Sequence, residues 1–549
     1  MFLFVLDKLR SFNRKELGEN IRNNWFIALS SLFYLLLNTG MPALIKMPFN
    51  SYFSIIPAFV LITVFTAICS PFGMFCKKTS RKVRAVAFFS AAGTCFGVWK
   101  VLRYCPYMFF RDHTFIIRTA AMILGIPFVF ALCLILWHRL EELLRSVYSE
   151  AGVRKYELIF YAVIFLLYCV YVTICFMSSK AFYESDALGD VIYSSDSPDI
   201  IKFNAFVLND HHQNDIRQPL FSIFAAPLMG IPCIIGNLIP GIPMALVLDY
   251  AQIALLILTT FMLATRLRLS VFQRMSFMLV SFSAFTVLLF SVMIEQYIIA
   301  YFWLVMTICF LDKEKEAGPL AIAASGSLLT SGILMPFIYF PKRFSVEAVF
   351  AFVKKAVFWG VDFVFVMLMA GRLHILCNAG YSLLILSDYM GDKVSLISRI
   401  LQYFNFVSGY FTAPGSGMLI HENMAVWQLK EVTSLSVAGV VIFVLAVASF
   451  FFTRKEQISR IALGWIVFST AVLILVGWGT AENGLILYSL YFGWPFFVLI
   501  FNCLKSFENK LNTKVLIPVC SVILSLVMLV FNIPGIYKMV EFAVSNYPA

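Results

Sequence analysis

Acidic side chains gather in the polar stretch 179–219, and two of them stand at a helix start. Asp196 and Asp199 flank Ser197 and Pro198, and serine followed by proline is a common N-cap and first helical residue. The positive end of the helix dipole favours an ionised carboxylate there, and such a carboxylate can act as a general base. We therefore predict Asp196 as a catalytic base. The alternative is that both aspartates only stabilise the helix start, which suits Asp199 better.

The residues after Pro198 have the periodicity of a short amphipathic helix. Apolar side chains recur at helical spacing and form one stripe. They are Ile200, Ile201, Phe203, Ala205, Val207 and Leu208. The pattern predicts a helix that lies in a membrane surface, with Asp196 just before its first turn.

A second polar group stands in the segment DIRQPLFSIFAAPL, residues 215–228. It contains Arg217, whose guanidinium can bind a phosphate through two parallel hydrogen bonds. Arg217 is therefore the first candidate for a phosphate ligand. Weaker candidates are Arg372, His374 and Lys430.

Two glutamates stand at the ends of apolar runs. Glu295 lies in IEQY and Glu482 in GWGTAENGLILYSLYF, where a charge is costly and needs a reason. The alternative is that both reach interfacial water and have no function. Together with Asp186 and Asp199 of the acidic stretch, they are candidates for binding a polar substrate.

No motif indicates a resident metal or other cofactor. His211 and His212 are adjacent in a polar loop, where histidines are more often solvated than ligands, and no i, i+4 histidine pair accompanies them. The twelve cysteines include no C-x-x-C pair and read as small apolar side chains. A divalent metal is an open alternative that no motif supports.

The amino-acid composition indicates that these residues belong to a protein embedded in a lipid bilayer. The chain has 549 residues, of which 61% are hydrophobic and 13% charged, whereas soluble domains carry about 25% charged residues. A bilayer can absorb this apolar surface and water cannot. The net charge of +12 does not indicate a nucleic-acid partner, because the basic residues form short clusters between apolar runs, as in cytoplasmic loops.

The apolar runs predict an all-α, polytopic membrane protein with about thirteen transmembrane helices. The runs are 25–45, 51–74, 85–102, 115–137, 157–178, 243–264, 275–293, 297–311, 356–376, 434–453, 461–478, 485–502 and 514–532. Basic clusters place the N-terminus in the cytoplasm, the C-terminus outside, and segments 179–219 and 377–432 on the outer face. We expect an integral multi-pass protein of the cell (inner or plasma) membrane.

Two segments are predicted to depart from simple crossings. If 220–264 crossed twice, Arg266, Arg268 and Arg274 would lie outside, against the positive-inside pattern. We therefore predict that 220–237 is an interfacial or re-entrant helix on the outer face. By the same parity, 317–341 is predicted to be a hairpin that turns at Ser325, Ser327, Thr330 and Ser331.

The order of these features resembles the type C glycosyltransferase fold. The resemblance rests on the acidic outer loop, the interfacial helix and the segment Arg217-Gln218-Pro219-Leu220, which is similar to the H/K-P-P-L sequence of that fold, and on IEQY and SLLTSG. It covers 157–343 best, with weaker support from 470–500. It suggests an N-terminal module of four crossings, 1–156, a catalytic module, 157–343, and C-terminal helices, 344–549.

The resemblance implies an inverting transfer at the outer face. The donor would be a sugar linked to a polyprenyl phosphate, and the acceptor a glycan, lipid or protein of the cell envelope. Asp196 would deprotonate the acceptor hydroxyl, and outer cations such as Arg217 would hold the donor phosphate.

Two other classes of function are consistent with the same sequence. An O-antigen polymerase or ligase also has about a dozen helices and a large outer loop, and would depend on outer Arg and His side chains without Asp196. A transporter or flippase would place polar groups at mid-membrane on broken helices; the main mid-helix charges here are Asp249 and Asp362. The depth of the polar cavity distinguishes an outer-face enzyme from a transporter.

The predicted sidedness can be tested by cysteine labelling in intact cells. In a cysteine-free background, a cysteine at position 190 should react with an impermeant maleimide from outside, and one at position 81 should react only after permeabilisation. Labelling of position 190 only after permeabilisation would contradict the predicted topology.

Overall fold

The computed structural model describes most of the chain. The described residues are 14–37, 51–68, 76–101, 115–183, 191–197, 200–201, 206–207, 216–239, 241–339, 345–377, 379–380, 384, 387, 390–391, 394–421, 424–481 and 483–549.

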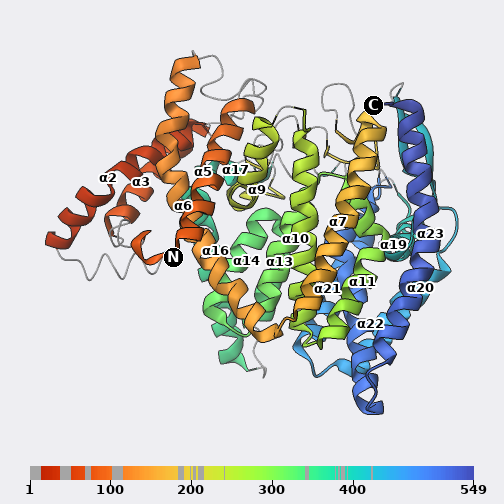
Figure 1. The fold of residues 1–549 in the computed structure, drawn as a ribbon. Coiled ribbons are helices and arrows are strands. Elements are labelled where there is room, and N and C mark those ends of the chain that lie inside the picture. Colours follow the sequence, from red (N-terminus) through yellow and green to blue (C-terminus); the bar gives the residue numbers. More distant parts are fainter. Residues whose placement is uncertain are drawn as a thin grey trace. The chain divides into compact units, whose positions relative to one another are not determined.

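The described residues are overwhelmingly helical (Figure 1), which confirms the predicted class of all-α membrane protein. Seven described helices are long and apolar enough to cross a bilayer. They are α6 (Phe115–Ala151), α7 (Lys155–Ser178), α9 (Phe221–Leu238), α10 (Met244–Arg266), α21 with the following π-helical turn (Gln457–Val476), 3-10 helix η7 with α22 (Leu485–Leu511) and α23 (Leu516–Asn546).

An eighth span would result if a bent pair of helices counts as one. Helix α11 (Val271–Ser283) and helix α12 (Phe285–Val292) meet at an angle of 65°. The sequence predicted a single crossing over 275–293. Helix α13 (Tyr297–Cys309) and helix α20 (Val437–Thr453) are apolar but shorter. The thirteen crossings therefore stay a prediction.

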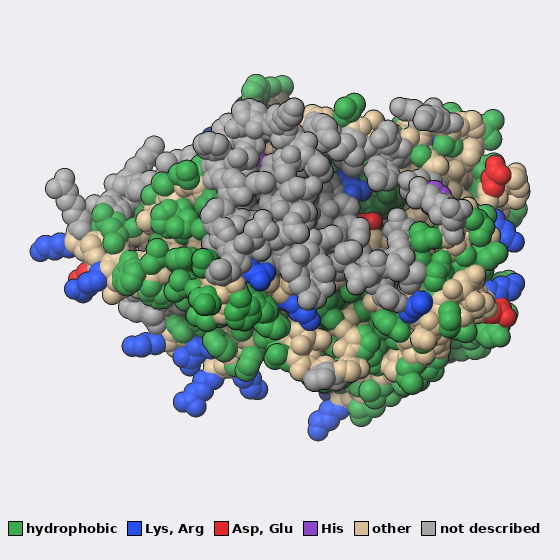
Figure 2. All heavy atoms as spheres, turned by 90° about the horizontal axis from the view of Figure 1, so that it is seen from above, with side chains coloured by type: hydrophobic (Ala, Val, Ile, Leu, Met, Phe, Trp, Pro, Cys, Tyr) green, Lys and Arg blue, Asp and Glu red, His purple; other side chains and the backbone are tan. Residues whose placement is uncertain are grey.

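The long helices expose apolar side chains, as helices that face lipid do. On α7 and α23 the exposed side chains are mostly large and aliphatic, the reverse of a soluble protein. They include Ile159, Leu166, Leu167 and Ile174 on α7, and Ile523, Leu526, Val530 and Ile533 on α23. Figure 2 shows that hydrophobic side chains cover much of the described surface on one face. Such an apolar exterior fits a bilayer.

The chain divides into two compact units, each assembled from three separate segments. The first unit contains residues 1–146, 199–248 and 313–383, and the second contains 147–198, 249–312 and 384–549. This division does not test the three consecutive modules predicted from the sequence.

The first unit contains α2 (Arg14–Leu37), α3 (Ser51–Ile68), α5 (Arg81–Val101), most of α6, α9, α14 (Glu314–Ser327), the 3-10 helix η3 (Leu329–Ile333), α15 (Leu334–Tyr339), α16 (Val346–Met369) and α17 (Leu373–Cys377). Small residues let helices α5 and α9 of this unit pack closely.

The closest approach is at Gly93 of α5 and Gly230 of α9. A Cβ at Gly93 would lie 1.8 Å from the Gly230 carbonyl oxygen, so a side chain there would separate the helices. Helix α14 ends at Ser327, within the predicted turn.

The second unit contains α7, most of α10, α11, α12, α13, α19 (Leu396–Phe411), α20, α21, α22 and α23. It also holds a β-hairpin that the sequence analysis did not predict. Strand β1 (Ser416–His421) pairs antiparallel with strand β2 (Met424–Leu429), with Met418 opposite Trp427. The hairpin lies within 377–432, the segment predicted to form an outer surface.

A buried ion pair links α7 to α11 in the second unit. The Arg274 guanidinium donates to both carboxylate oxygens of Glu157, over 2.7 and 2.8 Å, and also to the Leu269 carbonyl. The Tyr161 hydroxyl donates to Glu157 as well. Both charged side chains are almost completely buried. Because a buried charge is tolerated only when it is paired, this network fixes the two helices against each other.

We predict that Glu157→Gln destabilises the second unit by about 3–5 kcal/mol, since it leaves the Arg274 charge buried without its counter-charge. Thermal unfolding of the detergent-solubilised protein should show a clear fall in Tm. Glu141→Gln is the matched control, because its ion pair with Arg145 is on the surface and should cost below about 1 kcal/mol. Equal Tm values for the two variants would contradict the prediction.

Candidate functional site

The break between α12 and α13 brings Asp196 and Glu295 together in the second unit. Helix α12 ends at Val292 and α13 begins at Tyr297, so Glu295 stands between them with a side chain 1% exposed. Its Oε1 accepts a hydrogen bond from the Asp196 backbone N–H over 2.9 Å. The Ser197 hydroxyl donates to the Ile294 carbonyl over 3.0 Å. The two bonds fix Asp196 and Ser197, just before the predicted interfacial helix, against the IEQY turn.

The β-hairpin fixes the residues that precede Asp196. The Tyr193 N–H donates to the Trp427 carbonyl and the Trp427 N–H donates to the Val191 carbonyl, both over 2.7 Å. The Trp427 indole N–H also donates to the Tyr193 hydroxyl over 3.2 Å. Tyr193 and Ser194 have φ values of 53° and 55°, a conformation that side chains disfavour. Strand β2 therefore holds a tight, strained turn immediately before the carboxylate.

Tyr193 stays a neutral phenol in this turn. Burial raises the pKa of its hydroxyl to about 12. The hydroxyl is also 2.8 Å from Ser416 Oγ in β1. Tyr193 is therefore a fixed hydrogen-bonding group beside the half-buried Asp196.

A buried amide connects Glu295 to a carboxylate inside α10. The Gln252 Nε2 group donates to Asp249 Oδ1 over 3.0 Å and to the Met293 carbonyl over 3.3 Å. Gln252 Oε1 accepts from the Glu295 backbone N–H over 3.3 Å. All of these groups are buried. The amide is bonded on both sides, so it holds the Glu295 backbone at a set position.

Gln252 was missed at the sequence level. A signal was present, because Asp249 and Gln252 are three residues apart on one face of an otherwise apolar helix. A polar pair inside an apolar run needs a partner. The partner comes from the α12–α13 turn, which is distant in sequence and so was not visible.

The predicted phosphate ligand Arg217 lies in the first unit. Its backbone carbonyl accepts from the Leu329 N–H over 2.6 Å, and the Leu220 N–H donates to the Gly326 carbonyl over 2.9 Å. The structure thus joins RQPL and SLLTSG, two of the motifs on which the resemblance rests. The Arg217 side chain is half-buried, at the point where the polar loop enters α9.

The other predicted cations differ in accessibility. Arg372 and His374 are 2% and 0% exposed in the first unit, and His374 Nδ1 lies 3.5 Å from Ser54 Oγ of α3. Lys430 is exposed and follows β2 in the second unit. Of these three, only Lys430 presents its charge at a surface.

Several predicted residues lie outside the described residues. They are Asp186, Asp199, Glu482, His211 and His212. Within the part of the chain that the structure describes, no three His, Cys, Asp or Glu side chains gather closely enough to hold a metal ion.

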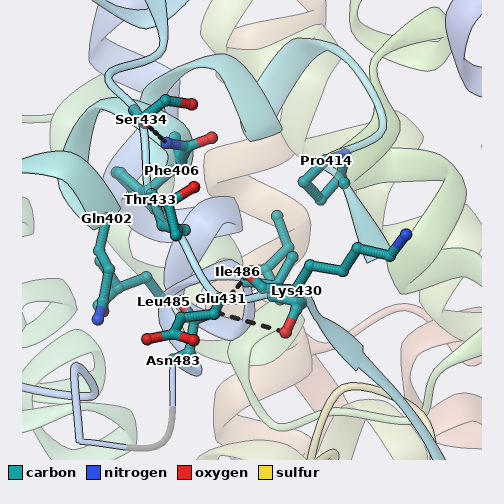
Figure 3. A pocket seen from close by; sticks show the side chains of 14 residues that line it. Gln402, Phe406, Pro414, Lys430, Glu431, Thr433, Ser434, Asn483, Leu485 and Ile486 are labelled. Atoms are coloured by element: carbon teal, nitrogen blue, oxygen red, sulfur yellow. Dashed lines mark hydrogen bonds between the residues drawn. The ribbon is translucent and has the colours of Figure 1, made fainter. Parts of the chain in front are cut away.

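An open pocket of about 600 Å³, part of it open solvent, lies beside Lys430 in the second unit (Figure 3). It is formed by the middle of α19, residues 414–415, the end of β2 with the residues after it, and residues 483–486. Apolar side chains such as Phe406, Leu485 and Ile486 line it together with amides and hydroxyls.

Comparisons with protein-family models, with curated proteins and with solved structures find no match for this chain. The resemblance to the type C glycosyltransferase fold therefore rests on the motif residues and on their contacts.

We predict that Gln252→Met destabilises the turn that carries Glu295. The substitution leaves the Glu295 N–H and the Met293 carbonyl without their partner, and an unpaired buried polar group costs about 1–3 kcal/mol. Thermal unfolding in detergent measures the loss. Thr259→Val, also on α10, is the matched control, because it removes only a bond within the helix. A Tm as high as that of the control would contradict the predicted role.

Proposed function

We propose that this protein is a membrane glycosyltransferase that uses a polyprenyl-phosphate-linked sugar at the outer face. The observation that carries the proposal is the hydrogen bond from the Asp196 N–H to the buried Glu295 carboxylate. It joins the acidic loop to the IEQY turn, two motifs of the resemblance that are distant in sequence. The RQPL and SLLTSG contact supports it independently.

In the proposed reaction Asp196 accepts the proton of an acceptor hydroxyl. The hydroxyl oxygen bonds to the anomeric carbon while the bond from that carbon to the phosphate oxygen breaks, and the polyprenyl phosphate leaves with the electron pair. One displacement inverts the anomeric configuration. Because phosphate is already a good leaving group, positioning and charge stabilisation provide most of the rate enhancement.

The residues have distinct roles in this proposal. Glu295 positions Asp196 by holding its backbone N–H, and its burial keeps that support rigid. Arg217 is the proposed ligand of the donor phosphate, with a guanidinium that matches two phosphate oxygens. Asp186, Asp199 and Glu482 stay proposed ligands of sugar or acceptor hydroxyls.

The proposed membrane arrangement is the one predicted from the sequence. It has about thirteen crossings, with 220–237 as a non-crossing helix and the active site on the outer face. Helix α9 covers this segment as Phe221–Leu238, with Pro227 and Pro232 inside it. Prolines inside a helix free carbonyl groups, which in a membrane need protein or a cavity beside them.

One observation favours a carrier as a second candidate. Asp249 lies within α10 and is fully buried, and no donor among the described residues reaches its Oδ2. A buried carboxylate inside a membrane helix is common on transport pathways. A carrier would lose substrate uptake when Asp249 is changed, whereas the proposed enzyme would lose transfer when Asp196 is changed.

We predict that Asp196→Asn lowers the rate of sugar transfer about 10²–10⁴-fold, because the amide cannot accept the proton. Transfer from a polyprenyl-phosphate sugar by the purified protein in lipid measures the effect, with extracted yield and Tm recorded in parallel. The bond to Glu295 uses the backbone of Asp196, so folding should be spared. Asp312→Asn is the matched control, since Asp312 is an exposed partner of Arg266.

Full activity of Asp196→Asn would contradict the assignment and direct attention to Asp199 or Asp186. An equal loss of yield and activity would instead support a role in the helix start alone.

A further inference from the structure

The pocket beside Lys430 contains a buried acceptor that no donor in the described part of the chain reaches. Gln402 on α19 is 8% exposed and lines the pocket. Its Nε2 group donates to the Thr480 carbonyl over 3.3 Å, which sets the orientation of the amide. No donor among the described residues reaches its Oε1. A buried acceptor without a donor raises the free energy of the folded protein. A ligand that donates a hydrogen bond to this oxygen removes that cost, and the gain contributes to its affinity.

The rim of the pocket is held in place before any ligand arrives. The Lys430 N–H donates to the Gly415 carbonyl over 3.0 Å, and Asn483 Nδ2 donates to the Lys430 carbonyl over 3.1 Å. Asn405 Nδ2 donates to the Ser434 carbonyl over 3.3 Å. These bonds connect α19, the segment after β2 and the turn at 483. A pre-formed rim lowers the entropy cost of binding.

The charges of the pocket favour a neutral ligand. Among its described lining residues, Lys430 and Glu431 carry opposite charges and are adjacent in sequence. In the view of Figure 3, the Glu431 carboxylate lies on the same side of the pocket as the Gln402 amide, and the Lys430 amine extends away toward Pro414. A phosphate would meet the carboxylate, and a cation would meet the lysine, so neither ion suits the site.

The groups available suit hydroxyls. A carboxylate and an amide oxygen accept from O–H donors, and the Thr433 and Ser434 hydroxyls can both donate and accept. Phe406, Leu485 and Ile486 supply an apolar surface on which the C–H face of a ring can rest. An apolar surface with a few convergent polar groups is the usual composition of a ligand site. A neutral sugar has hydroxyls for the polar groups and a C–H face for the apolar surface.

We infer that this pocket binds a neutral oligosaccharide, with Gln402 Oε1 and Glu431 accepting its hydroxyls. The inference rests on the proposed function only in taking that oligosaccharide to be the acceptor. Strand β2 connects the two sites: Trp427 fixes the turn before Asp196, and Lys430 follows three residues later, about 10 Å along an extended chain. An acceptor held in the pocket is thus bound by the same hairpin that positions the proposed base.

Binding can be measured without turnover. Short neutral oligosaccharides with a fluorescent label would be titrated onto the full-length protein in lipid nanodiscs, with a labelled acidic oligosaccharide and inorganic phosphate as comparison ligands. Gln402→Leu and Glu431→Ala should each weaken neutral binding about tenfold or more, because a site built for hydroxyls loses an acceptor in each variant. Glu541→Gln, exposed on α23, is the control and should leave binding unchanged.

Thermal stability separates binding from a structural role of Gln402. No donor among the described residues reaches Oε1, so leucine removes a buried polar penalty. Leucine also removes the Nε2 bond to the Thr480 carbonyl, but that carbonyl still accepts from the Asn483 N–H. The Tm of Gln402→Leu should therefore be equal to or above that of the parent. Weakened binding with a Tm that is not lowered supports the inference, and a lowered Tm with unchanged binding overturns it.

Three further outcomes would overturn the inference. They are unchanged binding in both variants, preferential binding of phosphate or of the acidic oligosaccharide, and no binding of any neutral oligosaccharide. If transfer in the Asp196 assay is intact in these cases, the proposed function stands and the acceptor lies elsewhere. If neutral binding depends on Gln402 while Asp196→Asn keeps full transfer activity, the binding site stands and the proposed base is wrong.

Discussion

A carboxylate buried among apolar helices must be given hydrogen-bond donors, and the placement of Glu295 is the constraint around which the candidate site is arranged. Its Oε1 accepts from the Asp196 N–H, and its own N–H donates to Gln252. The bend between α11 and α12 and the break before α13 bring this residue to the loop. Without the break, Glu295 would be one residue of a long apolar helix with no route to the acidic segment.

Two of the buried polar systems in the second unit differ in how completely their groups are paired. Glu157 and Arg274 neutralise each other through two hydrogen bonds, and Tyr161 adds a third. The system around Gln252 instead includes an Asp249 oxygen that no described donor reaches. A closed network stabilises a fold, whereas an open one retains a capacity to bind a proton or a ligand. This contrast separates the structural pair from the groups near the proposed site.

The β-hairpin contacts both the turn before Asp196 and the pocket that contains Gln402. Trp427 forms hydrogen bonds with the strained turn at Tyr193, and the residues just after β2 form a wall of the pocket that contains Gln402. A strand holds neighbouring residues at fixed spacing, which helices joined by loops do not ensure. The proposed base and the proposed acceptor pocket would therefore depend on the same short strand, in a chain whose described residues are mostly helical.

The sequence by itself determined that the protein lies in a membrane and that its fold is all-α. Apolar runs of membrane length and few charges require helices in a bilayer, because the backbone there must satisfy its own hydrogen bonds. It also indicated Asp196 and Glu295 as candidates beside one cavity that exposes Arg217 as well, since charges beside apolar runs need a reason. The bond that joins Asp196 to Glu295 could not be predicted, because it uses the backbone N–H of Asp196, a group that every residue but proline carries. Gln252, Gln402 and the hairpin were missed for a related reason: each matters through a partner that is distant in sequence. Only the tertiary structure decided which of the described buried polar groups have hydrogen-bond donors, because those donors come from residues distant in sequence.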